Sequence, residues 1–98
     1  MSLHNDTADA FRHCAWSGAI TQRVGEARAE RITTRHETAA PGRDNLQGYA
    51  EMGMDLANNA TGRSVGSQAN SEGGSDTWGW IIDRCYSLAT SDQLVVLE

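Results

Sequence analysis

The chain has 98 residues, a net charge of −5 and eight basic residues, all of them arginine. A chain of this length makes one domain, residues 1–98, without room for a second hydrophobic core. The acidic balance excludes a protein that coats nucleic acid, which needs a basic stripe, although it is compatible with a metal-dependent nuclease. No apolar run approaches the roughly 18 residues of a membrane span, so we expect no transmembrane segment.

Capping residues and helix breakers divide the chain into four expected helices, at about residues 7–24, 26–38, 46–67 and 76–89. Asn5 or Asp6 can cap the first helix, and Gly25 can end it. Pro41 stops the second helix, because proline removes a backbone donor and disfavours helical geometry in the residue before it. The expected fold is all-α, a compact single domain of about four helices.

Two further segments follow the third and fourth helices. Residues 69–75 are rich in Gly, Ser and Asn, so we expect a flexible loop there. Ser75 or Asp76 can cap the fourth helix. The apolar tail at 93–97 is expected to form either a short strand or a strap over the core.

The two cysteines, Cys14 and Cys85, can form one disulfide. Such a bridge would join the first helix to the last, and it would imply an oxidising compartment. The alternative is two buried thiols in a reducing compartment. We favour the disulfide, with the two Cα atoms less than ~7 Å apart.

A polar face runs along the third expected helix. Six residues at i, i+3, i+4, i+7, i+8 and i+11 share it: Asp55, Asn58, Asn59, Gly62, Arg63 and Gly66. Asp, Asn and Gly are poor helix formers, and each Gly costs roughly 1 kcal/mol, so this face is expected to serve close packing or chemistry. The carboxylate and amides can supply oxygen ligands, and the alternative is a polar network that fixes two helices in register.

Two other polar segments can meet that face. The first helix presents Asp9, Arg12, His13 and Trp16 on one side. A carboxylate four residues before a histidine can orient the imidazole, so His13 is a candidate base or metal ligand, and Asp9 is itself a candidate ligand. His36 and Glu37 follow near the end of the second helix, where the carboxylate opposes the helix dipole. Together the three segments predict a polar cleft between helices, and the alternative for each is a solvated surface cluster.

The order of these segments resembles a known family. Residues 8–17 contain D-A-F-R-H-x-x-W, His36 and Glu37 supply H-E, and residues 54–66 read M-D-x-x-N-N-x-x-G-R-x-x-G. This order resembles a helical domain of unknown function found in bacterial secreted proteins and at the C-termini of polymorphic toxins. The resemblance covers about residues 5–66, and the Gly-rich segment from Ser71 departs from it.

The resemblance implies a toxin-like hydrolase, secreted or delivered into the periplasm of a target cell, with residues 1–98 as the C-terminal domain of a longer protein. A lipid, phosphodiester or peptidoglycan of the cell envelope suits such a toxin, and a cognate immunity protein is the expected partner. The catalytic candidates are then His13, His36, Glu37 and Asp55. The candidates for substrate binding are Arg12, Trp16, Asn58, Asn59 and Arg63. A divalent metal is the candidate cofactor, with Asp9, His13, His36 and Asp55 as its candidate ligands.

Two alternatives remain at this point. Glu37 is a candidate general acid for a peptidoglycan glycosidase, which would need a second carboxylate such as Asp55 or a positioned water. In the other alternative, the domain is a binding or structural module, and its polar face is only a packing network.

Overall fold

The structure is a computed structural model that describes residues 5–39 and 45–96. Its four helices are α1 (Asn5–Val24), α2 (Glu26–Ala39), α3 (Leu46–Glu72) and α4 (Thr77–Thr90). The described residues form no strand, so the predicted all-α fold is confirmed. Within the described ranges, no helix combines the length and the low polarity that a membrane span requires.

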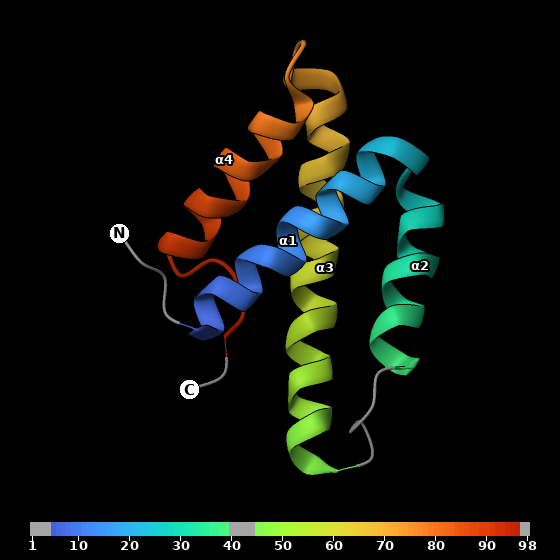
Figure 1. The fold of residues 1–98 in the computed structure, drawn as a ribbon, viewed down its shortest axis with the longest axis vertical. Coiled ribbons are helices and arrows are strands. Elements are labelled where there is room, and N and C mark those ends of the chain that lie inside the picture. Colours follow the sequence, from blue (N-terminus) through green and yellow to red (C-terminus); the bar gives the residue numbers. More distant parts are fainter. Residues whose placement is uncertain (1–4, 40–44, 97–98) are drawn as a thin grey trace.

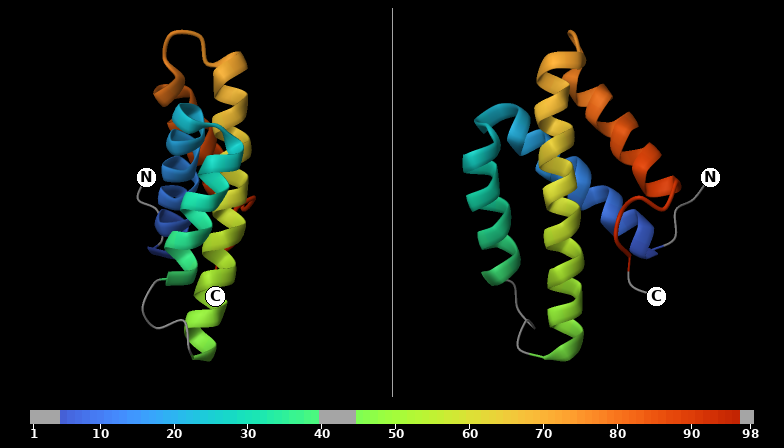
Figure 2. Two further views of the ribbon diagram at one scale, coloured as in Figure 1. Left: turned by 90° about the vertical axis from the view of Figure 1, so that its right-hand side faces the viewer. Right: turned by 180° about the vertical axis from the view of Figure 1, so that it is seen from behind.

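The helices form a thin assembly in which α1 crosses α3 obliquely. In Figure 1, α2 and α4 lie on opposite sides of α3, and α1 passes over its face. The edge-on view in Figure 2 shows how flat the arrangement is, and the Cα atoms extend over 43 × 33 × 15 Å. Both α2 and α4 pack against α1 and α3. The α1–α3 pair therefore carries two separate interfaces, one toward each flanking helix.

The crossing of α1 and α3 depends on glycine. A Cβ atom added to Gly62 would collide with the backbone of Cys14, and one added to Gly66 would collide with the backbone of Gly18. The two glycines are one helical turn apart, so they let the two backbones approach closely over a full turn. The sequence predicted close packing or chemistry at Gly62 and Gly66, and the structure shows that helix α1 is the segment that approaches them.

The apolar core lies between α1, α3, α4 and the tail. Its buried members are Ala10, Cys14, Ala15, Val65, Ala69, Ile81, Cys85, Leu88, Ala89 and Leu94. The predicted disulfide between Cys14 and Cys85 is present, with Cα atoms 5.8 Å apart, and it ties α1 to α4 inside this core. Within the described part of the chain, α2 adds no residue to the core cluster.

The tail is a strap rather than a strand. Asn58 holds it, because its Nδ2 donates to the Val95 carbonyl oxygen and its Oδ1 accepts from the Val95 amide, both at 2.8 Å. Leu94 is buried, so the apolar tail covers the end of the core. A strap over the core was one of the two alternatives that the sequence predicted.

The helix ends agree with the sequence except after α3. Gly25 has a φ of +87° between α1 and α2, and Asp76 caps α4 by accepting from the Gly79 amide at 2.9 Å. The loop predicted at 69–75 is wrong in its first half, because α3 continues to Glu72. Ala69 is fully buried in the core, and this packing overrides the weak helix propensity of its neighbours. The predicted stop at Pro41 lies outside the described residues.

Candidate functional site

His13 lies at the centre of a cluster to which α1, α2 and α3 all contribute. Its Nδ1 is 3.2 Å from Oε2 of Glu37 and 3.1 Å from Oδ1 of Asn59. Its Nε2 is 3.3 Å from Oδ1 of Asp55 and 3.7 Å from Oδ2 of Asp9. The cluster contains two i, i+4 pairs, Asp9/His13 on α1 and Asp55/Asn59 on α3, which face each other because the two helices cross at this level. The three polar segments of the sequence therefore meet in one place.

The Nδ1 side of the cluster is sealed from solvent. Glu37 is 1% exposed and Asn59 is fully buried. Asn59 donates from Nδ2 to Oε2 of Glu37 at 3.1 Å, and its Oδ1 accepts from the hydroxyl of Ser17 at 2.8 Å. This chain of hydrogen bonds fixes the carboxylate against the imidazole. Sequence reasoning missed Ser17, although its position four residues after His13 places it on the same face of α1.

The Nε2 side of the cluster is more open. The side chain of Asp55 is 9% exposed, that of His13 is 17% exposed and that of Asp9 is 39% exposed. Arg12 extends from the same helix, and its Nη2 is 3.5 Å from Oδ1 of Asp9. Asp9 therefore marks the side of the cluster nearer to solvent, although Oδ1 of Asp55 beside Nε2 is itself buried, and Glu37 lies behind the ring.

The four nearest partners of the His13 ring are all oxygen acceptors. A neutral imidazole carries hydrogen on only one nitrogen, so one of its two nitrogens would face acceptor oxygens with no hydrogen between them. A protonated carboxyl group opposite that nitrogen would satisfy both sides, and so would either of two further arrangements. In one, His13 is an imidazolium that donates from both nitrogens. In the other, Nδ1 donates to Glu37 and Nε2 faces a cation.

A cation on the Nε2 side has suitable ligands. One ligand atom each from Asp9, His13 and Asp55 lie within 4.8 Å of one another. Two carboxylates and an imidazole are a donor set that Mg²⁺, Mn²⁺ or Zn²⁺ can use. Glu37 completes the pattern, because metal-bound histidines commonly donate their other N–H to a carboxylate.

His36 lies apart from this cluster. Adjacent residues on a helix point about 100° apart, so burying Glu37 against α3 turns His36 outward. The His36 side chain is exposed, and its ring packs against that of Trp16 in a tilted arrangement with centroids 5.0 Å apart. The geometry therefore does not favour the predicted metal and catalytic roles of His36, and the ligand set that it supports is Asp9, His13 and Asp55.

Two of the predicted substrate-binding residues hold elements together. Asn58 binds the tail, as described above. Arg63 is partly buried and donates from Nη1 to the hydroxyl of Thr33 at 2.9 Å, which links α3 to α2. Both contacts are with the protein itself, so we leave these two residues out of the proposed site.

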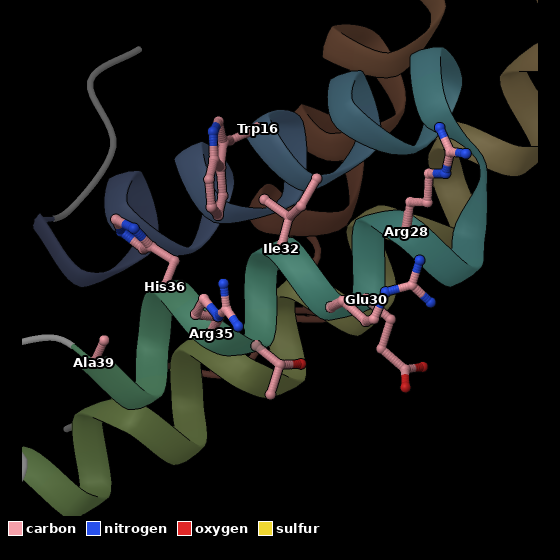
Figure 3. Close-up of a pocket in the computed structure, with 9 residues that line it drawn as sticks. Trp16, Arg28, Glu30, Ile32, Arg35, His36 and Ala39 are labelled. Atoms are coloured by element: carbon pink, nitrogen blue, oxygen red, sulfur yellow. The ribbon is translucent and has the colours of Figure 1, made fainter.

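An open groove lies beside the cluster, along the outer side of α2. It has a volume of about 1210 Å³, and Figure 3 shows Trp16 of α1 next to Ile32 and His36 of α2 in its wall. Trp16 also packs edge-on against the His13 ring, with centroids 6.4 Å apart. The indole therefore separates the groove from the His13 cluster and contacts both.

Comparison with known families assigns the chain without assigning an activity. The chain belongs to the family described as a domain of unknown function, DUF6973, whose model matches residues 1–91. Neither the curated proteins nor the solved structures yield a match. Any statement about function must therefore come from the geometry of the site.

Proposed function

We propose that this DUF6973 domain is a toxin-like hydrolase of cell-envelope phosphoesters that works with a divalent cation held by Asp9, His13 and Asp55. The observation that carries the proposal is the surrounding of His13, whose two ring nitrogens face acceptor oxygens on both sides. A cation next to Nε2 explains why two carboxylates lie on that side of the ring. Glu37 accepts the hydrogen that Nδ1 then carries.

The charges of the cluster support this proposal. Three carboxylates, from Asp9, Glu37 and Asp55, lie within 3.7 Å of one imidazole. Like charges in a partly buried site destabilise one another, and a divalent cation offsets them more fully than a single imidazolium. When bound, such a cation would acidify a water molecule and polarise a phosphoryl oxygen.

The residues of the chain have distinct parts in this proposal. Glu37 accepts the hydrogen of Nδ1 and thereby turns Nε2 toward the open side. Asn59 and Ser17 hold Glu37 and the ring in place from the buried side. Asp9, the most exposed member of the cluster, lies where substrate and water approach.

The setting of the proposed reaction follows from other observations. The disulfide between Cys14 and Cys85 suits an oxidising compartment, such as the bacterial periplasm or the outside of a cell. Delivery as a secreted toxin with a cognate immunity protein fits that setting, and it remains part of the proposal.

The buried position of Glu37 makes the glycosidase alternative less suitable. A general acid must reach the leaving oxygen of its substrate. Glu37 is 1% exposed, with Asn59 and His13 on one of its oxygens. A purely structural network would bury the same residues, but it would show neither hydrolysis nor dependence on a cation.

The test measures hydrolysis and stability together. Hydrolysis by the wild type is measured on a soluble phosphodiester and on phospholipid vesicles, with divalent cations and after chelation. Killing is measured by periplasmic expression in bacteria. His13→Asn and Asp55→Asn are compared with Glu72→Gln, a control that removes an exposed carboxylate at the end of α3. We expect both site variants to lose hydrolysis and killing, and the control to keep them.

The melting temperature decides how a loss of activity is interpreted. If the cluster is only a packing network, removing a buried partner costs about 1–3 kcal/mol, and activity falls only as far as stability does. Loss of hydrolysis at an unchanged melting temperature, with dependence on added cation, supports the proposal. Full activity in both site variants, or after chelation, contradicts it.

A further inference from the structure

We propose that the groove along α2 is a docking surface for an anionic phospholipid bilayer, an inference that rests on the proposed function because the bilayer would present the phosphoester to the His13 cluster. The surface is defined by Trp16, Arg28, Arg31, Ile32, Arg35 and His36.

Helical spacing gathers the basic residues into a stripe. Arg28, Arg31 and Arg35 follow one another at i, i+3 and i+7, which places them on one side of α2. All three are exposed, and none forms a salt bridge within the described part of the chain. Among the described residues, Glu30 is the one carboxylate that lines the groove. The surface is therefore positive in a chain whose net charge is −5.

An apolar side chain stands within this stripe. Ile32 is 45% exposed, although it is the only large aliphatic residue of α2. It lies one residue from Arg31 and one turn from Arg28 and Arg35, so arginines flank it on both sides along the helix. An exposed aliphatic residue framed by arginines suits the boundary between headgroups and acyl chains, where basic residues bind the anionic headgroups.

The aromatic wall of the groove fits the same environment. Trp16 is half-buried and packs against His36, and indole rings are favoured at membrane–water interfaces. Figure 3 shows Trp16 beside Ile32 in the lining of the groove. Trp16 also contacts the His13 ring, so the indole lies between a headgroup bound at this surface and the proposed catalytic cluster.

The position of α2 makes the surface accessible to a flat bilayer. α2 forms one edge of the thin molecule, and its outer side points away from α3 (Figure 1). Its buried residues, Ala29, Thr33 and Glu37, all face inward. A free phosphate has no apolar group that could contact Ile32. A nucleic acid would favour a longer basic stripe with stacking aromatics. The combination of charge and an aliphatic side chain favours a bilayer.

Binding is tested without catalysis, by sedimentation of the protein with vesicles in the presence of a chelator. The vesicles are phosphatidylcholine, either pure or mixed with phosphatidylglycerol. Each basic residue near an anionic surface contributes roughly fivefold to partitioning. We therefore expect Arg31→Gln/Arg35→Gln to weaken binding to the mixed vesicles by about 25-fold, and Ile32→Asn to weaken it several-fold. Raised salt should weaken wild-type binding, because it screens the attraction.

Two control variants remove one exposed arginine and one exposed large apolar side chain outside the groove. Arg84→Gln removes an exposed arginine on α4, and Trp78→Ala removes the most exposed aromatic side chain among the described residues. Both should bind like wild type. Equal binding to the two vesicle types, equal loss in control and groove variants, or stronger binding to inorganic phosphate or single-stranded RNA than to the mixed vesicles would overturn the inference. His13→Asn should still bind vesicles, so a failure of the docking surface can be told apart from a failure of the proposed hydrolase.

Discussion

The two sides of the α1–α3 pair differ in the residues that they bury. Toward α4 the buried residues are aliphatic or small, and a disulfide joins Cys14 to Cys85 among them. Toward α2 they include a polar cluster, with His13, Glu37 and Asn59 at its centre. The same two helices thus carry an apolar interface and a polar one on different faces of the same turns, since Cys14 belongs to the first and the adjacent His13 to the second.

The apolar interface is the expected source of stability, and the polar interface is the proposed site of chemistry. Apolar burial is the main favourable term in folding, whereas buried polar groups give little net stability even when they are fully hydrogen-bonded. The α4 side is therefore expected to hold the fold together. The α2 side gathers three carboxylates around one imidazole, and in the proposed function that arrangement serves cation binding.

The largest expected effect comes from the disulfide on the apolar side. The bridge joins residues 71 positions apart, and opening a loop of that size costs about 4 kcal/mol in the chain-entropy model. Cys14→Ala/Cys85→Ala should lose that much free energy of unfolding, measured by urea denaturation. The free energy of unfolding of the wild type in reductant provides a parallel measurement. A loss below ~1 kcal/mol would show that the apolar side is stable without its covalent link.

The helix crossing should be the next most sensitive feature. Gly62→Ala places a methyl group against the backbone of Cys14, which cannot move without separating α1 from α3. We expect a loss of about 3 kcal/mol. Gly53→Ala is the matched control on the same helix, because nothing lies within 4 Å of its added Cβ, and it should gain about 1 kcal/mol. Equal effects of the two substitutions on the melting temperature would contradict the close crossing.

A smaller effect is expected for Asn58, a polar residue that holds the tail over the apolar core. Asn58→Ala removes two hydrogen bonds to the backbone of Val95 and should cost about 1–2 kcal/mol. Hydrogen exchange should show faster exchange of the Val95 amide. Asn70→Ala, which removes an exposed amide on the same helix, should change stability by less than about 0.5 kcal/mol. Unchanged exchange at Val95 would mean that the tail is held by Leu94 alone.

The sequence predicts the parts of the site that helical periodicity governs. Asp9 and His13 are four residues apart, as are Asp55 and Asn59, and this spacing places each pair on one face wherever the helices begin and end. The caps at Gly25 and Asp76 were predictable for a similar reason, because each acts on its own helix.

The remaining features depend on packing between segments that are distant in sequence. The inward turn of Glu37 and the outward turn of His36 follow from the contact between α2 and α3, which no local pattern specifies. The extension of α3 to Glu72 likewise depends on burial of Ala69 in a core built by other helices. The pairing of Asn58 with Val95 joins positions 37 residues apart.

The most direct test of the proposed site is a calorimetric titration of Mn²⁺ into the chelator-treated protein. We predict one binding site in wild type, no binding in Asp9→Asn/Asp55→Asn, and affinity 10–100-fold weaker in Glu37→Gln, because its carboxylate orients the ligand His13. Glu30→Gln, the exposed counterpart on α2, should bind like wild type. No binding by wild type, or equal binding by all four proteins, would show that the His13 cluster is a buried ion-pair network and not a metal site.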